Sequence, residues 1–243
     1  MLQTTTALIL AGGFGTRLQS VVKDIPKPMA PIGNQPFLHY LFLYLKKFGI
    51  KKVVLLVGYK HEVITSHFGN NYSGIEVAYS IEHEPLGTGG AIMKAMQSIN
   101  SNCFLLNGDT FFNVDLWQME NTINTNETDI ALALSLQKKF DRYGTVLFNQ
   151  QQKVTAFQEK KWVDEGWING GVYWINQHFF EKIKTQCNVE LPTKFSFEKD
   201  VFETFTHQLN LLAFLQQQYF IDIGIPEDYT RAQSELPLYF SAV

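Results

Sequence analysis

Short apolar runs alternate with longer amphipathic segments through the first half of the chain. The run Val53–Val57 is unbroken, which is typical of a strand buried on both faces of a sheet. The segment 36–48 instead repeats its apolar side chains at helical spacing and is followed by Gly49, a common helix stop. By the same criteria we predict strands at Ala7–Leu10, Val53–Val57, Ile75–Ser80 and Cys103–Leu106, and helices at Pro36–Phe48, His61–Phe68 and Ala91–Ile99. This alternation predicts a Rossmann-like α/β fold with a doubly wound, mostly parallel central sheet.

The second half of the chain has a different pattern. The runs Gly144–Phe148 and Val154–Gln158 are short and separated by a polar turn, which predicts a hairpin. A longer strand, Trp167–Ile175, is interrupted at 169–171 by Asn-Gly-Gly. Further strands are expected at Ile130–Leu136, Leu211–Leu215 and Tyr219–Ile223, and helices at Leu116–Ile123, Gln177–Lys184, Ser196–His207 and from Pro226. We therefore expect a mostly antiparallel second half (113–243) packed on the first (1–112) within a single domain over residues 1–243.

Three polar, glycine-containing loops follow predicted strands of the first half. They are Ala11–Arg17, Glu84–Gly90 and Asn107–Asp109. The carboxyl ends of parallel strands meet at one edge of a sheet, where ligands of such folds bind. We therefore expect the three loops to lie together and to form a binding site.

Composition narrows the choice of ligand and compartment. The chain has 243 residues, 45% of them hydrophobic, and a net charge of −3, which gives no reason to expect binding to nucleic acid or to an anionic membrane. A phosphate ligand would therefore need local cations. The two cysteines lack metal-ligand spacing, no basic segment precedes the first apolar run, and no apolar run reaches the roughly 18–20 residues that span a bilayer. We expect a cytoplasmic protein without a membrane segment.

The first loop combines glycines with cations. Gly12, Gly13 and Gly15 can expose backbone N–H groups to phosphate oxygens, and Arg17 and Lys27 can neutralise phosphate charge. The spacing matches neither the P-loop nor the dinucleotide-binding fingerprint, so a plain tight turn is about as compatible with the glycines alone. The cations, and the restricted backbone of Lys27 between two prolines, favour a nucleoside-triphosphate site.

Two acidic residues are candidates for a metal pair. Asp109 follows an apolar strand, where a carboxylate commonly caps a turn but can also hold Mg²⁺ against phosphates. Asp222 lies within the apolar run Tyr219–Ile223, where a charge is costly unless it is paired or metal-bound. Asp222 therefore gives the stronger indication of a metal site.

Other polar residues of the second half have ordinary alternatives. Lys160 could bind a phosphate and Glu159 hydroxyl groups, but a solvated charged turn explains them equally well. The interruption at 169–171 fits either a bulge or the close approach of a ligand. His39 falls on an apolar helix and is expected to be a satisfied core residue, and Cys103 a buried thiol. No arrangement in the chain indicates a covalent nucleophile.

Seven motifs together resemble the sugar-1-phosphate nucleotidyltransferases. They are LAGGFGTRL, PKPM, EPLGTGGA, NGDTFF, the Glu-Lys pair at 159–160, Asn-Gly-Gly at 169–171 and FIDIGIPEDY, in the family's order. Within the family, runs such as KDIPKPMAPI, VGYKHE and FDRYGTV look most like the members that transfer a guanylyl group to a heptose 1-phosphate. The resemblance implies GTP and a sugar 1-phosphate as substrates, Mg²⁺ as cofactor, pyrophosphate as a product and a role in surface glycan synthesis. A homo-oligomer is compatible with it.

The resemblance also implies roles for individual residues. The catalytic group is Arg17, Lys27 and Asp109, and the metal ligands are Asp109 and Asp222. The nucleotide is bound by Leu10, Ala11, Gly12, Gly13, Gly15, Thr16, Tyr59, Glu84, Pro85, Gly87 and Thr88. The sugar phosphate faces Tyr143, Gly144, Glu159, Lys160, Asn169 and Gly170, with Lys160 on the phosphate. The first half is thus mainly nucleotide-binding and the second mainly sugar-binding. The chain lacks the hexapeptide repeats that many relatives carry, so we expect no second activity.

Several alternatives remain open at this point. Within the family they are a mannose-1-phosphate guanylyltransferase and a uridylyl- or thymidylyltransferase. A catalytically silent nucleotide sensor is disfavoured because the cations and acids of the site are all present. A dehydrogenase is disfavoured by the glycine spacing.

Overall fold

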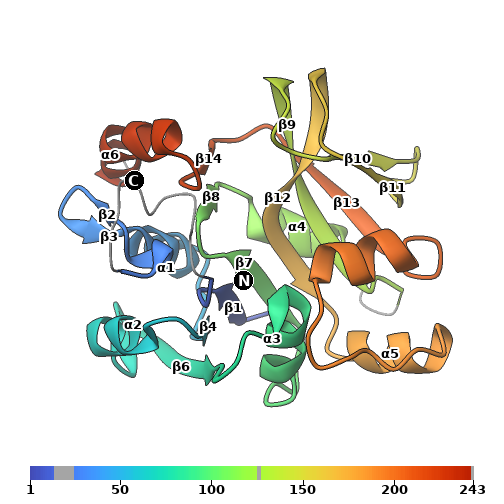
Figure 1. The fold of residues 1–243 in the computed structure, drawn as a ribbon, viewed down its shortest axis with the longest axis horizontal. Helices are drawn as coiled ribbons and strands as arrows, with labels where there is room; N and C mark the ends of the chain where they lie inside the picture. Colours follow the sequence, from blue (N-terminus) through green and yellow to red (C-terminus); the bar gives the residue numbers. More distant parts are fainter. Residues whose placement is uncertain (14–24, 125–126, 242–243) are drawn as a thin grey trace.

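The structure is a computed structural model that describes residues 1–13, 25–124 and 127–241. The predicted residues Gly15, Thr16 and Arg17 lie outside the described residues. Most strands belong to a ten-stranded mixed sheet, along which β11-β10-β12-β7-β1-β4-β6-β5 follow one another, while β9 pairs with β12 and β13 (Figure 1).

The first half of the chain supplies the parallel part of this sheet. Strands β1 (Thr6–Leu10), β4 (Lys52–Val57), β6 (Ile75–Ile81) and β7 (Cys103–Asn107) run parallel in the order β7-β1-β4-β6, and β5 (Asn71–Tyr72) adds an antiparallel edge. Helices α1 (Phe37–Lys47), α2 (His61–Phe68) and α3 (Gly87–Met96) connect them. The doubly wound arrangement predicted from the apolar runs is confirmed.

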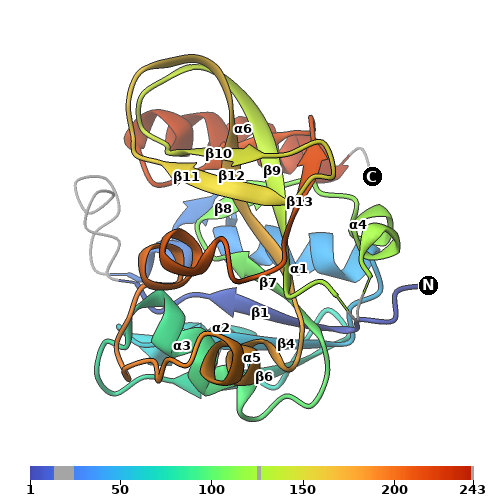
Figure 2. The same ribbon diagram turned by 90° about the vertical axis from the view of Figure 1, so that its right-hand side faces the viewer.

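Alternate side chains of β1 pack into two different hydrophobic cores. Ala7 and Ile9 belong to the core that includes α1 and α6 (Pro226–Ser241), while Leu8 belongs to the core that includes α3 and α5 (Phe179–Gln186). Figure 2 shows α6 and α5 on opposite sides of the strands. Both faces of the parallel strands are therefore covered, which is why their sequences are continuously apolar.

The second half extends the sheet with antiparallel pairs. The long strands β9 (Ile130–Phe140) and β12 (Val163–Ile175) pair along most of their length, β10 (Thr145–Phe148) and β11 (Val154–Gln158) form the predicted hairpin, and β13 (Leu211–Gln216) runs parallel to β9. The end of β12 pairs with β7, so one sheet unites the two halves. The register shift between Asn169 and Tyr173 confirms the predicted interruption of this strand.

Two segments differ from prediction. The third helix begins at Gly87 instead of Ala91. The glycines that suggested a turn lie in its first turn, where a Cβ would overlap the Phe195 backbone, the Phe195 ring or the Thr193 backbone. The helix expected at 196–207 is a short π-helix, η3 (Phe197–Glu203), capped by the Ser196 side chain.

A short ladder outside the main sheet pairs the predicted strand at Tyr219–Ile223 with a strand that was not predicted. Strand β8 (Thr110–Phe112) pairs antiparallel with β14 (Phe220–Asp222), and α4 (Leu116–Thr122) follows β8. The remaining short elements are η2 (Lys27–Met29), β2 (Pro31–Ile32) and β3 (Gln35–Pro36). Among the described residues, no helix is long and apolar enough to span a bilayer.

Candidate active site

A cavity of about 690 Å³ lies at the carboxyl ends of the parallel strands. Its wall comes from the loops after β1, β4, β6 and β7, from η2 and from the start of α3. Ten of the residues predicted to bind nucleotide or to act in catalysis line it: Leu10, Gly12, Gly13, Lys27, Tyr59, Glu84, Pro85, Gly87, Thr88 and Asp109. The expectation that the three glycine-containing loops share one sheet edge thus agrees with the described part of these loops. Ala11 differs, since its side chain is buried in the core.

Main-chain hydrogen bonds between neighbouring strand ends fix this wall. The Ala11 N–H donates to the Leu56 carbonyl at 2.8 Å, the Gly108 N–H to the Leu10 carbonyl at 2.9 Å, and the Glu82 N–H to the Val57 carbonyl at 2.8 Å. These bonds continue the parallel ladders by one residue beyond the strands. The loops around the cavity are therefore positioned by the sheet itself.

Lys27 and two carboxylates form a cluster at one end of the cavity. The Lys27 Nζ atom lies 2.6 Å from Asp109 Oδ2 and 4.0 Å from Asp222 Oδ1. The β8–β14 ladder brings the two acids together, because it places Asp222 opposite Thr110 and joins the Ile223 N–H to the Asp109 carbonyl at 3.0 Å. The Lys27 side chain is only 10% exposed, so its ammonium is largely shielded from water, whereas the Asp109 side chain is 38% exposed.

Asp222 is held by two further donors. The Gly224 N–H donates to its Oδ1 at 2.7 Å, and the Tyr143 hydroxyl donates to its Oδ2 at 3.3 Å. Burial, followed by the negative charge of Asp109, raises the pKa of Asp222, while Lys27 and the hydrogen bonds act in the opposite direction. One ammonium beside two carboxylates leaves a net negative charge, which favours a further cation.

The donor set fits a hard divalent cation that shares its coordination with phosphate. Mg²⁺ is commonly bound by one or two carboxylates together with substrate phosphates and water. Asp109 and Asp222 supply two such groups at the edge of the cavity. No group of three or more metal-ligating acids, histidines or cysteines occurs in the parts of the chain that the structure describes, so a complete protein cage is not available there.

The residues predicted to face a sugar phosphate do not all line one cavity, unlike most of those predicted for the nucleotide. Tyr143 reaches Asp222, and the Arg142 guanidinium lies over its ring at 5.1 Å from the centroid. Glu159 and Lys160 are exposed after β11 and make no hydrogen bond or ion pair with residues 1–13, 25–124 or 127–241. Gly144 lies against the Gln158 carbonyl, where a Cβ would overlap.

The interruption of β12 connects this region to the nucleotide cavity. Asn169 donates from Nδ2 to the Tyr173 hydroxyl at 2.7 Å and accepts the Gly171 N–H at 3.1 Å, so its side chain holds the bulge. Gly171 has φ of +73°, and a Cβ there would lie 2.7 Å from Asn107 Nδ2, which itself lines the cavity. Gly170 packs against the Phe112 ring. Close packing therefore accounts for both glycines.

Sequence reasoning missed several residues that line the cavity, among them Glu82 and Glu198. Glu82 lies two residues after the end of the strand predicted at 75–80, and its position close to this strand end was an available signal. Glu198 had no local signal, because η3 reaches the cavity only through tertiary packing. It accepts the Thr88 hydroxyl at 2.8 Å and the Ser196 hydroxyl at 3.1 Å, and so joins the start of α3 to η3.

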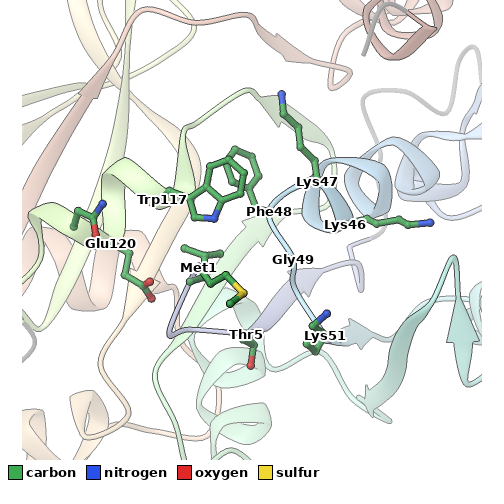
Figure 3. A pocket seen from close by; sticks show the side chains of 11 residues that line it. Met1, Thr5, Lys46, Lys47, Phe48, Gly49, Lys51, Trp117 and Glu120 are labelled. Atoms are coloured by element: carbon green, nitrogen blue, oxygen red, sulfur yellow. The ribbon is translucent and has the colours of Figure 1, made fainter.

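A second cavity of about 390 Å³ lies at the other end of β1, where Thr5 precedes the strand. Figure 3 shows Met1, Phe48 and Trp117 around it, with lysine side chains that point in different directions. No residue predicted for the site lies there. The expectation for Cys103 is confirmed, since its side chain is fully buried. His39 has the expected hydrogen-bond partner, with its Nδ1 2.9 Å from the Tyr72 hydroxyl, but it is only half-buried and is not a core residue.

Comparison with known proteins identifies relatives over nearly the whole chain. The family model described as nucleotidyl transferase matches residues 6–237. The D-glycero-alpha-D-manno-heptose 1-phosphate guanylyltransferases of Aneurinibacillus thermoaerophilus and Campylobacter jejuni are 52% and 48% identical, over 96% and 92% of this chain and 99% and 96% of theirs. HddC from Yersinia pseudotuberculosis, solved in complex with GMP-PN, has a TM-score of 0.82 and 36% identity, covering 96% of this chain and 99% of that one. These matches confirm the resemblance drawn from the motifs.

Proposed function

Since the chain belongs to the nucleotidyl transferase family, we propose that it transfers the guanylyl group of GTP to D-glycero-α-D-manno-heptose 1-phosphate. The products are GDP-heptose and pyrophosphate. Two relatives that are about half identical carry the name of this activity, and a structural relative was solved with a guanine nucleotide analogue. The match covers nearly the full length of these proteins.

The observation that carries the proposal is the cluster of Lys27, Asp109 and Asp222 at the edge of the cavity. A phosphomonoester is largely ionised near neutral pH, so the acceptor oxygen needs no general base. The difficulty is that the anionic sugar phosphate must approach the α-phosphorus of the anionic GTP. A site with a shielded cation and a place for a second one, and without a nucleophilic side chain, suits that task.

We assign the reacting end of GTP to this cluster. The cavity loops after β1 and β4 bind the nucleoside. The Lys27 ammonium, which forms an ion pair with Asp109 in the structure, faces the α-phosphate when GTP is bound. Gly12 and Gly13 offer backbone N–H groups to the phosphates. Asp109 and Asp222 would hold Mg²⁺, which neutralises phosphate charge when it is bound. The predicted phosphate contacts of Gly15, Thr16 and Arg17 belong to the same proposal.

The acceptor enters from the side of β9–β12. Tyr143 borders that side of the cluster through its hydrogen bond to Asp222. In the proposal Asn169 and Gly170 face the sugar phosphate, and Lys160 supplies a cation for the acceptor phosphate. The sugar phosphate would then approach the α-phosphorus opposite the departing pyrophosphate. This in-line geometry is a proposal that rests on the relative positions of the cavity and the cluster.

The proposal is tested by substrate pairing. The purified protein is incubated with GTP, UTP or dTTP, each with D-glycero-α-D-manno-heptose 1-phosphate or mannose 1-phosphate. Pyrophosphate release gives the rates, and mass spectrometry identifies the nucleotide sugar. We expect the highest kcat/KM for GTP with the heptose 1-phosphate. Turnover with UTP but not GTP, or a preference for mannose 1-phosphate, would contradict the base or the sugar assignment respectively.

A further inference from the structure

A buried carboxylate in the first turn of α6 pairs with two guanidinium groups. Asp228 is buried, its Oδ2 accepts a hydrogen bond from Arg142 Nη2, and its Oδ1 accepts one from Arg231 Nη1 at 2.8 Å. Arg142 comes from the connection between β9 and β10. Taking a partner from a buried carboxylate is strongly destabilising, so this contact ties that connection to α6.

The two arginines differ in their other contacts. Arg231 also pairs with Glu235, whose Oε1 lies 3.1 Å from Arg231 Nε, so both of these partners lie on α6 itself. Arg142 instead lies over the ring of Tyr143, with its guanidinium carbon 5.1 Å from the ring centroid. This separation is within the range of a cation–π contact. Arg142 therefore links Asp228 to the Tyr143 ring.

The ring of Tyr143 is held by further aromatic neighbours. It contacts Phe220 edge to face at 6.0 Å between centroids and Phe140 in a tilted arrangement at 6.2 Å. The Tyr143 hydroxyl then donates to Asp222 Oδ2 at 3.3 Å. This distance is beyond the usual range for a hydroxyl donor, so even a small shift of the ring would break the hydrogen bond.

Two roles can be considered for Arg142. Its side chain is 40% exposed, so it could bind the acceptor phosphate directly. Its Nη2, however, is committed to Asp228, and its planar face is committed to the Tyr143 ring. Burial acts to lower the pKa of Arg142, but Tyr143, Asp228 and Asp222 raise it above its ordinary value, so Asp222 lies within electrostatic reach. These contacts favour an indirect role.

We propose that Asp228, acting through Arg142, is a positioning residue for Tyr143. The Gly224 N–H holds Oδ1 of Asp222 and the Tyr143 hydroxyl holds Oδ2, so the two donors together fix the rotation of this carboxylate. The first turn of α6 thereby sets how Asp222 presents its oxygens to a cation. This inference rests on the proposed function, because that function assigns Asp222 to Mg²⁺.

Charge-conserving variants separate positioning from charge. Arg142→Lys keeps the positive charge and can still pair with Asp228, but an ammonium lacks the planar fork that also lies over the ring. We expect kcat to fall about 2- to 5-fold, as for the loss of one hydrogen bond, and KM for both substrates to change by less than about 2-fold. Arg231→Lys is the matched control, since it alters the other partner of the same carboxylate, and it should keep the wild-type kcat.

Asp228→Asn tests the same link from its buried end. It removes the charge that holds the Arg142 guanidinium and should lower kcat by a similar factor, with circular dichroism and thermal melts to check the fold. In a Tyr143→Phe background, neither Arg142→Lys nor Asp228→Asn should lower kcat by more than about 1.5-fold further, because the hydroxyl that they position is already absent. Losses that multiply in the double variants would contradict the link through Tyr143.

Binding of Mn²⁺ gives a readout that does not depend on turnover. With Mn²⁺ alone as the probe, electron paramagnetic resonance should give a dissociation constant about 2- to 5-fold higher in Arg142→Lys and unchanged in Arg231→Lys. Unchanged kcat and Mn²⁺ affinity in Arg142→Lys, equal losses in both arginine variants, or a higher KM for the sugar phosphate at constant kcat would each overturn the positioning role. If the wild-type protein forms no GDP-heptose, the proposed function fails, whereas the Mn²⁺ comparison still decides the role of Arg142.

Discussion

The two sides of the Asp109–Asp222 pair are built differently. On the nucleotide side, defined by the loops after β1, β4, β6 and β7, backbone hydrogen bonds from the sheet set the position of the wall. On the acceptor side, defined by β9–β12, the residues expected to bind the sugar phosphate include the exposed Glu159 and Lys160 after β11. The comparison teaches that main-chain bonds of the parallel sheet are enough to shape the cavity that we assign to the nucleotide. The cation that we assign to the acceptor phosphate instead lies in solvent.

The largest effect is expected where the two sides meet. Asp222→Asn removes one of the two carboxylates but keeps an oxygen acceptor for the Gly224 N–H, and its amide NH2 can donate to the Tyr143 hydroxyl, so the fold should be retained. We expect kcat to fall by about 100-fold or more, comparable to the loss of a transition-state contact. Initial rates at several Mg²⁺ concentrations, with thermal melts, measure this. Asp164→Asn, at an exposed site on β12, is the matched control, and wild-type turnover of Asp222→Asn at limiting Mg²⁺ would refute the metal pair.

The next effect concerns the rigidity of the nucleotide side. A Cβ on Gly108 would overlap the Leu10 carbonyl, which accepts the N–H of the same residue. We therefore expect Gly108→Ala to lower the free energy of unfolding by about 1–3 kcal/mol, as overpacking does. Urea denaturation measures the change. Gly13→Ala is the stability control, because no atom of the described residues lies within 4 Å of a Cβ there. Equal stability of both variants would show that the β1–β7 contact can relax.

Local patterns in the sequence were sufficient for the parallel half of the fold. The apolar runs fixed the strands, and the helix at His61–Phe68 has the predicted bounds because Gly69 ends it. The start of α3 could not be predicted, since the glycines of its first turn are explained by Phe195, far along the chain. The strand expected at Tyr219–Ile223 is present as β14, but β8 and its pairing with β14 were not predicted, because a three-residue strand carries no periodic signal.

Local patterns likewise placed some residues of the candidate site but not others. The glycines and Asp109 follow strands, so strand prediction was enough to place them on one edge. The approach of Asp222 to Asp109 depends on the unpredicted ladder, and only its charge in an apolar run indicated a special position. Glu198 reaches the cavity through packing of η3 on α3, which no local pattern contains. Long-range contacts are therefore what the sequence left open.

A smaller effect should separate the two sides in kinetics. Lys160→Ala removes a cation assigned to the acceptor phosphate, and we expect KM for the sugar phosphate to rise about 10-fold, or about 1.4 kcal/mol. KM for GTP should change by less than about 2-fold. Steady-state kinetics with each substrate varied in turn measures both, and Lys161→Ala at the neighbouring exposed position is the control. A larger rise in KM for GTP would assign Lys160 to the nucleotide side instead.

The smallest effect decides to which side Tyr143 belongs. The sequence predicted that it faces the sugar phosphate, whereas its hydroxyl donates to Asp222 Oδ2 at 3.3 Å. If that bond is its main contribution, Tyr143→Phe should lower kcat by about 2- to 5-fold, near the lower end for a single hydrogen bond, and leave KM for the sugar phosphate unchanged. Burial and then the charge of Asp222 raise the pKa of Tyr143, so its hydroxyl remains a donor through neutral and mildly alkaline pH. The ratio of wild-type to variant kcat should therefore stay constant between about pH 7 and 9, below the ordinary tyrosine pKa of about 10. A rise in KM for the sugar phosphate at constant kcat would instead place Tyr143 on the acceptor.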